Sequence, residues 1–367
     1  MKPNAETLDR LTAEAVELLQ SLIRIPAPSR EEGERADFIE QQLKDWGLAP
    51  RREGNNLWCL SEMRPGRPTL LLNAHIDTVR PVKGWQRDPF CPTAEGDRLY
   101  GLGSNDCGGG LVALLQTFRL LRNEAATPWN LVYLASAEEE VSGRDGLERA
   151  LPLLPPIDCA VVGEPTGLQP AIAEKGLMVL DVTARGRAGH AAREEGINAI
   201  YRALPDIEWF RTFRFPRVSP LLGPVKMSVT VIHAGTQHNV VPDTCTFTVD
   251  VRSNELYSNR EILDEICKNV NSEVKARSTR LNSSRIAMDH PLVRRAVALG
   301  CRPFGSPTLS DQALMPWPSL KLGPGESSRS HTADEYIRPA EIREAIAGNA
   351  HLDGAQQRQP TGEAERA

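Results

Sequence analysis

Histidine and acidic side chains directly follow apolar runs at several points along the chain. They are His75 and Asp77 at the end of TLLLNAHIDTV, Asp106 in the glycine-rich stretch YGLGSNDCGGG, Glu138, Glu139 and Glu140 after NLVYLASA, Glu164 after DCAVVG, and His331 beyond SLKLG. Ligands of open α/β sheets bind outside the carboxyl ends of the strands, which lie together at one edge. We therefore expect these side chains to meet at that edge.

Histidine nitrogen and carboxylate oxygen are ligands that suit zinc, manganese or cobalt(II). Two histidines and three carboxylates are enough for two ions if one carboxylate bridges them, and a pair of ions about 3.5–4 Å apart can lower the pKa of a shared water. Glu139 and Glu140 can divide the work, one holding an ion and the other accepting the proton of that water. Asp77 shares a strand face with His75 and can fix the orientation and tautomer of its imidazole.

Each part of this set also has an ordinary structural interpretation. The pair His75 and Asp77 can be a satisfied hydrogen bond of the core, the glutamates can begin a solvated helix, and Asp106 can be a turn residue. The glycines before the predicted helix can cradle a phosphate, but no lysine follows them as a P-loop requires. A metal centre is the favoured interpretation because every part follows an apolar run.

The elements that position these residues alternate between strand and helix. Apolar periodicity predicts helices at 9–24, 31–46 and 111–122 and buried strands at 69–76, 130–137 and 158–165. Such alternation is typical of an α/β sheet whose strands are largely parallel.

The pattern changes after about residue 175. It predicts strands at 176–186, 226–235, 245–253 and 274–281, with helices at 197–210, broken by Pro205, and at 260–271. This β-α-β-β-α-β order fits a small split-βαβ sandwich with one exposed sheet face, in which 226–235 and 245–253 form a hairpin. A helix near 291–301, a strand at 319–323 and a helix near 339–349 then resume the α/β character.

The expected organisation is a main domain, 1–174 and 285–350, interrupted by an inserted α+β domain, 175–284. The polar tail 351–367 is expected to be disordered. The net charge of -5 implies no basic surface for nucleic acid. No apolar run reaches the roughly 18 residues of a membrane helix, the N-terminus lacks a signal-peptide pattern, and the seven cysteines contain no CxxC pair. We therefore expect a reduced cytoplasmic protein.

Five segments in order, NAHIDTV, YGLGSNDCGGG, SAEEEVSG, VVGEPT and SHTADEYI, resemble the motifs of the co-catalytic zinc aminoacylase and carboxypeptidase family. The similarity runs from about residue 10 to 350 and is strongest to acetylornithine deacetylases, including the branch that acts on acetylcitrulline. It implies a metallopeptidase-like catalytic domain and a ferredoxin-like lid or dimerisation domain. It also implies one or two Zn²⁺ or Co²⁺ ions in each active site.

The resemblance implies a role for each matched residue. The metal ligands would be His75 and Glu164 on one ion, Glu140 and His331 on the other, and Asp106 as the bridge. Glu139 would be the general base and Asp77 the acid that orients His75. The family pattern also implies a cis peptide bond between Asp106 and Cys107, a cysteine that we expect to pack rather than act as a nucleophile.

The inserted domain matches the family as well. GRAGHAA resembles the motif whose histidine, here His190, reaches the active site of a partner subunit, so a homodimer through 175–284 is implied. NVVPD points to Asn239 and DVRS to Arg252 as substrate-binding residues, Arg252 for a carboxylate. Alternatively, His190 is a surface residue and Arg252 an arginine whose charged end reaches solvent.

Two positions depart from the family pattern. Leu102 stands where an arginine is common and Gly108 where a lysine is common, which lowers the charge of the loop. The implied activity is removal of the acetyl group from N-acetylornithine or N-acetylcitrulline in arginine biosynthesis, and the sequence leaves the choice of substrate and metal open. The alternatives are a dipeptidase or carboxypeptidase, a succinyl-diaminopimelate desuccinylase, and a non-catalytic metal-binding assembly protein.

Overall fold

The structure is a computed structural model that describes residues 3–193 and 195–351. The chain divides into two compact units. The first holds the chain up to Pro170, Ala287–Pro303 and the chain from Lys321, and the second holds Ala171–Ile286 and Phe304–Leu320. We predict a catalytic role for the first unit and a lid or dimerisation role for the second. Of the predicted tail, 351–367, only residue 351 belongs to the described residues.

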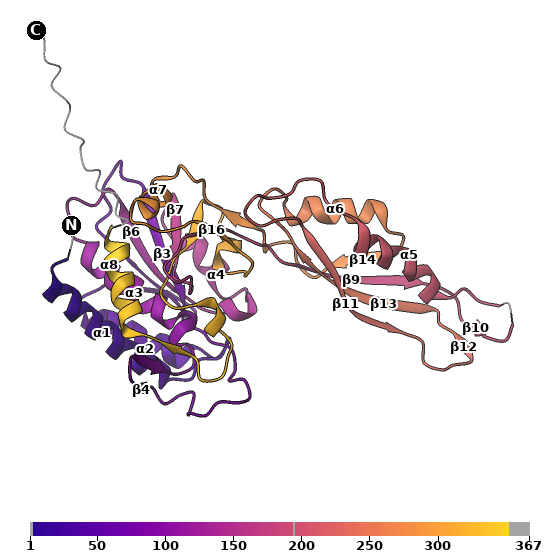
Figure 1. The fold of residues 1–367 in the computed structure, drawn as a ribbon, viewed down its shortest axis with the longest axis horizontal. Coiled ribbons are helices and arrows are strands. Elements are labelled where there is room, and N and C mark those ends of the chain that lie inside the picture. Colours follow the sequence, from indigo (N-terminus) through magenta and orange to yellow (C-terminus); the bar gives the residue numbers. More distant parts are fainter. Residues whose placement is uncertain (1–2, 194, 352–367) are drawn as a thin grey trace, which may run out of the picture. The chain divides into compact units, whose positions relative to one another are not determined.

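The first unit is built on a mainly parallel sheet (Figure 1). At its centre, β3 (Thr69–His75) pairs in parallel with β6 (Asn130–Ser136) on one side and with β7 (Cys159–Val162) on the other. Two antiparallel strands, β2 (Asn56–Leu60) and β1 (Arg51–Glu53), extend the sheet beyond β6. In the sequence, β17 (Ser319–Lys321) spans the point where the chain passes from the second unit to the first. Every residue of β3 and β6 is buried, as expected for strands that are covered on both faces.

The helices of the first unit pack along this sheet. α3 (Gly109–Leu121) lies against β3 and β6, and α1 (Ala5–Ile23) and α8 (Pro339–His351) pack against α3 (Figure 1). The other elements of this unit are α2 (Gly33–Asp45), η2 (Glu139–Val141), α4 (Leu147–Ala150), η3 (Leu151–Leu153), α7 (Pro291–Ala298), η5 (Ser327–Arg329) and a small sheet of β4 (Thr93–Glu95), β5 (Arg98–Tyr100) and β18 (Tyr336–Ile337).

The glycine cluster has a packing explanation. Gly109 and Gly110 begin α3, and a Cβ atom on Gly110 would lie 1.6 Å from the carbonyl oxygen of Gly163, just beyond β7. Only glycine lets the start of the helix approach the end of the strand this closely. The glycines therefore need no bound phosphate to account for them.

The second unit has the predicted β-α-β-β-α-β order. Its elements are β9 (Met178–Arg185), α5 (Ala199–Thr212), β11 (Lys226–Ala234), β13 (Thr244–Arg252), α6 (Asn259–Asn269) and β14 (Glu273–Ala276). The strands form an antiparallel sheet in the order β11-β13-β9-β14, with the predicted hairpin between β11 and β13. Buried and partly exposed residues alternate along β9 and β13, and the buried ones pack into one apolar cluster with residues of α5 and α6.

Two features of the second unit differ from the sequence prediction. The break at Pro205 is wrong, because α5 runs through it, with Ala203 before and Phe210 after the proline buried in the same cluster. Short strands also went unrecognised because each has too few residues to show a period: β8 (Ala171–Glu174), β10 (Gly189–His190), β12 (Val240–Val241), β15 (Ser284–Arg285) and β16 (Phe304–Ser306). No helix in the described ranges is long and apolar enough to cross a membrane.

Candidate metal centre

His75, the last residue of β3, offers one ring nitrogen to its neighbours. Its Nδ1 lies 2.9 Å from the backbone oxygen of Asp77, and a carbonyl oxygen can only accept, so Nδ1 carries the proton. The Nε2 atom is then the basic one in the neutral ring. It lies 3.3 Å from Asp106 Oδ1 and 3.7 Å from Glu164 Oε1. The ring is thus oriented to present a ligand atom to two carboxylates.

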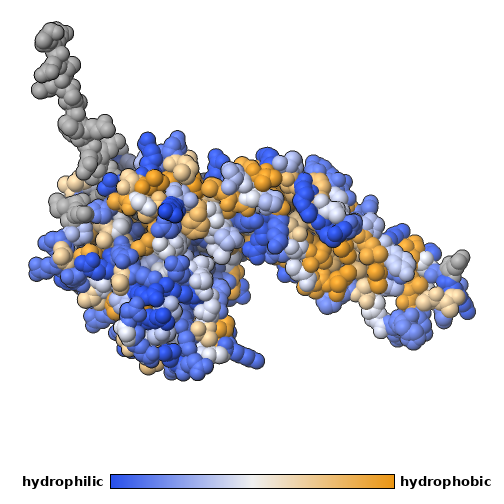
Figure 2. Space-filling model, viewed as in Figure 1, coloured by the Kyte–Doolittle hydropathy of each residue, from blue (hydrophilic) through white to orange (hydrophobic). Residues whose placement is uncertain are grey.

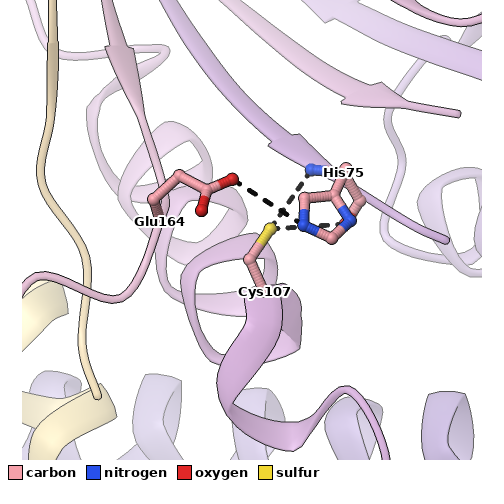
Figure 3. Close-up of side chains that lie close together, drawn as sticks. All are labelled: His75, Cys107 and Glu164. Carbon is pink, nitrogen blue, oxygen red and sulfur yellow. Dashed lines mark hydrogen bonds and ion pairs between the residues drawn. The ribbon is translucent and has the colours of Figure 1, made fainter. Parts of the chain in front are cut away.

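Glu164 brings a buried and unsatisfied oxygen to the same place. It follows β7 by two residues, and Figure 3 shows its side chain and that of Cys107 directed at His75. Its Oε1 atom has no hydrogen-bond partner among the described residues. Burial, and next the charge of Asp106, raise the pKa of Glu164 to about 8. A buried carboxylate oxygen without a donor is costly, and a cation would satisfy it.

Asp106 lies between the two histidines. It belongs to the turn η1 (Ser104–Gly108), and a cis peptide bond joins it to Cys107, as the family resemblance implied. Its Oδ1 faces His75, whereas its Oδ2 lies 3.6 Å from Nε2 of His331. One oxygen toward each histidine is the arrangement that a bridging carboxylate needs.

Glu140 and His331 form the other side of the centre. His331 Nε2 lies 2.9 Å from Glu140 Oε2, and this hydrogen bond is the main reason why the pKa of His331 is raised to about 9. Single ligand atoms of His75, Asp106 and Glu140 all lie within 4.8 Å of one another. Glu139 lies beside them, with its Oε2 4.0 Å from His75 Nε2. The structure therefore brings together the five predicted ligands and the predicted base.

Asp77 holds two segments of the centre at once. Its carboxylate is buried, lies 3.3 Å from His75 Nδ1 and accepts a hydrogen bond from the Ser29 hydroxyl at 2.7 Å. It also accepts the backbone N–H groups of Glu139 and Glu140, each at 3.1 Å. Sequence reasoning assigned it only to the histidine. Its contact with the glutamate turn had no sequence signal, because backbone donors carry no residue identity.

Glu335 was missed by sequence reasoning. It is buried, and its carboxylate accepts backbone N–H groups of the loop that carries Asp106, including that of Asp106 itself at 2.8 Å. Burial, and next the charge of Asp106, raise its pKa, whereas the three backbone N–H groups that it binds favour its ionised form. The available signal was its place in SHTADEYI, four residues after His331.

Cys107 packs beneath the centre. Its sulfur accepts the backbone N–H of His75 at 3.3 Å and lies 3.6 Å from the backbone oxygen of the same residue. Burial raises the pKa of the thiol far above its usual range. A protonated thiol is not a nucleophile.

The two departures from the family pattern also have a packing basis. Leu102 is buried. A Cβ atom on Gly108 would lie 2.4 Å from the carbonyl oxygen of Gly103 and 2.6 Å from Leu19 Cδ1. A lysine at 108 would therefore require this loop to move. The low charge of the loop is thus a consequence of its close packing.

The three remaining predicted residues lie in the second unit, whereas the metal-ligand candidates lie in the first. His190 is exposed on β10, next to β12, and its Nδ1 accepts the Ala192 N–H at 3.1 Å, so the neutral ring carries its proton on Nε2. Asn239 is its neighbour, since its backbone oxygen accepts the Ala191 N–H at 2.9 Å. Arg252, on β13, is held by the carboxylate of Asp250 at 2.9 and 3.0 Å.

The family of the chain follows from a comparison of its sequence with known families. Residues 71–352 match the model of peptidase family M20/M25/M40. The chain belongs to this family. The resemblance inferred from the motifs is thereby confirmed, and so is the α/β fold class. As an M20 protein, it is a metal-dependent hydrolase of the peptidase and amidohydrolase kind.

Individual relatives of this M20 hydrolase differ in activity. It is 30% identical over 308 residues to an acetylornithine deacetylase of Pectobacterium carotovorum, covering 77% of this chain and 79% of that one. It is 29% identical over 270 residues to a succinyl-diaminopimelate desuccinylase of Sulfurimonas denitrificans, covering 70% and 72%. A solved structure of a dinuclear metal-binding M20 peptidase from Bacillus subtilis has the same fold, with a TM-score of 0.70 at 15% identity over 94% of this chain and 98% of that one.

Proposed function

We propose that this M20 hydrolase removes the acetyl group from an N-acetyl amino acid, N-acetylornithine or N-acetylcitrulline, in arginine biosynthesis in the cytoplasm. The observation that carries the proposal is the position of Asp106 between His75 and His331, with Glu139 beside them. The motifs and the 30% identity to an acetylornithine deacetylase favour an acetyl substrate. A desuccinylase or a peptidase is the alternative that other relatives support.

The donor set fits one or two divalent ions, Zn²⁺ or Co²⁺. Nitrogen and carboxylate ligands suit both metals, and the unsatisfied Oε1 of Glu164 fits a cation. The residues that would hold the ions are His75, Asp106, Glu140, Glu164 and His331. When bound, such ions lower the pKa of a water molecule and polarise a carbonyl group.

Glu139 moves the proton. Asp77 accepts a hydrogen bond from the backbone N–H of Glu139, so the Glu139 carboxylate stays at the edge of the ligand cluster. Its carboxylate accepts the proton of the attacking water and passes it to the leaving amine, which becomes the free amino acid. His190 can donate from Nε2 to the acetyl oxygen and stabilise the negative charge that develops there. Asn239 and Arg252 would bind the rest of the substrate, and Arg252 would exchange Asp250 for the substrate carboxylate.

The test is a Glu139→Ala variant assayed with both acetylated amino acids. We expect metal content to be retained and turnover to fall about 10²–10⁴-fold, the usual contribution of a general base. Glu138→Ala is the matched control, because Glu138 is the adjacent glutamate and has no role in the proposal. Deacetylation by Glu139→Ala at the wild-type rate would show that the base is assigned wrongly.

A panel of substrates separates the alternatives. Acetylornithine, acetylcitrulline, succinyl-diaminopimelate and simple dipeptides are compared by kcat/KM. We expect one of the acetylated amino acids to be the best substrate. A preference for the succinyl compound or for dipeptides would replace the proposal with the corresponding alternative. No turnover of any of them with zinc or cobalt added would favour a non-catalytic metal-binding protein.

We also propose that the protein is a homodimer through residues 175–284. β11 is an edge strand of the second unit, and its Val231 and Ile232 are 44% and 52% exposed. Figure 2 shows hydrophobic residues gathered on the surface of this unit. An exposed edge strand with apolar side chains is a natural surface for self-association.

Mixing two inactive variants tests whether His190 acts in the partner's active site. His190→Ala and Glu139→Ala are unfolded together and refolded as a mixture. If His190 acts across the dimer, each mixed dimer contains one complete site, and the mixture recovers about a quarter of wild-type activity for random pairing of two-fold dimers. If it acts within its own subunit, no site is complete and the mixture stays inactive.

A further inference from the structure

Glu335 has an unusual set of hydrogen bonds. Its side chain is buried, at 2% exposure. Its Oε2 accepts the backbone N–H of Gly103 at 2.9 Å, and its Oε1 accepts those of Asn105 and Asp106, each at 2.8 Å. Its own backbone oxygen accepts the N–H of Gly101 at 3.0 Å. One acid thus holds the backbone of loop 101–106 at four places.

This loop carries the carboxylate at the middle of the ligand cluster. Asp106 is its last residue, and one of its carboxylate oxygens faces each of the two histidines. Glu335 itself follows His331 by four residues, and Tyr336 beside it pairs with Tyr100 at the start of the same loop. Glu335 therefore connects the segment of His331 to the segment of Asp106.

A second set of contacts joins the same two segments. The Asn105 amide nitrogen donates to the backbone oxygen of Glu326 at 3.1 Å and to the Ser330 hydroxyl at 3.3 Å. The Glu326 N–H donates to the Asn105 amide oxygen at 3.0 Å. Asn105 is held by Glu335 through its backbone, so loss of the Glu335 carboxylate would loosen these contacts as well.

Only a carboxylate can satisfy these donors. Three N–H groups point at two oxygens, and both oxygens of an ionised carboxylate accept. A glutamine in the same position offers one acceptor oxygen, and its NH₂ group would face an N–H donor. No cationic side chain of the described residues forms an ion pair with Glu335, although Asp106 lies beside it. The three backbone N–H groups therefore supply the polar contacts that this buried carboxylate requires.

We propose that Glu335 is a positioning residue of the metal centre. It acts through the backbone of loop 101–106 to direct the Asp106 carboxylate toward both ions. The inference rests on the proposed function, because it assumes that Asp106 bridges metal ions. Residues that orient metal ligands typically change metal affinity or activity about 10–100-fold when they are replaced.

The test is a titration of metal-stripped full-length protein with Co²⁺, followed by the visible absorption of bound cobalt. Glu335→Gln has nearly the same size, and we expect it to bind Co²⁺ about 10–100-fold more weakly than the wild type. Glu335→Asp keeps the charge but shortens the side chain, and we expect an intermediate loss. Circular dichroism confirms that each variant is folded before titration, so a general loss of structure is not counted as weak binding.

The matched control is Asp206→Asn in the second unit. Asp206 is also 2% exposed, and it accepts the backbone N–H groups of Asn271 and Ser272 at 3.0 and 2.8 Å and the Ser272 hydroxyl at 2.5 Å. This variant also loses a buried carboxylate that binds backbone N–H groups, but those groups belong to segments that carry no predicted metal ligand. We expect a lower unfolding temperature with Co²⁺ affinity and cobalt spectrum unchanged.

Several results would overturn the inference. Folded Glu335→Gln that binds Co²⁺ as the wild type does would overturn it, and so would an equal loss of affinity in Asp206→Asn. If Glu335→Gln does not fold, wild-type affinity in Glu335→Asp would overturn it. The titration uses no substrate, so a wild type that binds cobalt but hydrolyses none of the proposed substrates refutes the proposed function alone.

Discussion

The close approach of α3 to the end of β7 can be tested by Gly110→Ala. A Cβ atom at this position would lie 1.6 Å from the Gly163 carbonyl oxygen, and such contacts essentially never fall below 3.0 Å. The backbone would have to separate by about 1.4 Å, because no flexible side chain is available to give way. Gly163 directly precedes Glu164, so the shift would displace a predicted metal ligand.

The expected size of the effect follows from two opposing terms. Alanine favours a helix over glycine by about 1 kcal/mol. Overpacking typically costs about 1–3 kcal/mol and occasionally more, and contact with a rigid backbone places this site at or above the upper end. The net loss of unfolding free energy is then about 2 kcal/mol or more, which corresponds to an unfolding temperature lower by roughly 4–8 °C or more in a unit of this size.

The assay is thermal unfolding followed by circular dichroism, with cobalt titration as the second measurement. Gly348→Ala is the matched control, because Gly348 lies within α8 and an added Cβ atom would have nothing within 4 Å. It should gain up to about 1 kcal/mol. If Gly110→Ala unfolds at or above the wild-type temperature, as the control should, the packing explanation of the glycine cluster is wrong.

Three further outcomes follow from the contacts of the first unit. Asp77→Ala removes the acceptor of the Glu139 and Glu140 N–H groups. It should lower the unfolding free energy by about 3–6 kcal/mol, since each of the two bonds to a charged group contributes about 1.5–3 kcal/mol; a urea titration that shows no loss would contradict this. Burial raises the pKa of Glu341, but its hydrogen bonds with Arg329 outweigh burial and lower it. Ionised Glu341 therefore stabilises the fold above the unfolded pKa of about 4.3, and this stabilisation is lost as the pH falls through the folded pKa. The difference in unfolding temperature between the wild type and Glu341→Gln should be large at pH 7 and vanish in acid. A chelator should lower the unfolding temperature, and Zn²⁺ at about 100 times its dissociation constant should restore about 2.7 kcal/mol; an unfolding temperature that ignores both additions would contradict the metal centre.

Sequence patterns predicted the fold where local and tertiary preferences agree. The runs that became β3 and β6 are apolar throughout because both faces are covered, and β9 alternates because only one face is buried. Pro205 is the instructive failure. A proline removes one helical hydrogen bond, but buried Ala203 and Phe210 anchor α5 on both sides of it, and that packing outweighs the local preference.

The ligand residues were predictable because their identities are specific and each follows a strand or an apolar run. Apart from the role of Asp77 toward His75, the contacts that support these ligands were not predictable, because most of them are made to backbone N–H groups. Glu32 shows this well: it is wholly buried and accepts the N–H of Glu138 at 3.1 Å, yet in the sequence it is one acid among many in EEGERADF. A backbone donor is the same in every residue, so no spacing rule identifies its partner.

The ligand-bearing turns of this centre are held by acids from distant parts of the chain. Asp77 binds the turn of Glu139 and Glu140, and Glu335 binds the loop of Asp106. Each turn is bound by an acid from another segment, so the arrangement of the ligands depends on the packing of the whole unit. Metal affinity should therefore fall with substitutions that contact no ligand but displace these two acids, and it should fall further for a larger displacement. Substitutions confined to the exposed loop ends should leave metal affinity unchanged.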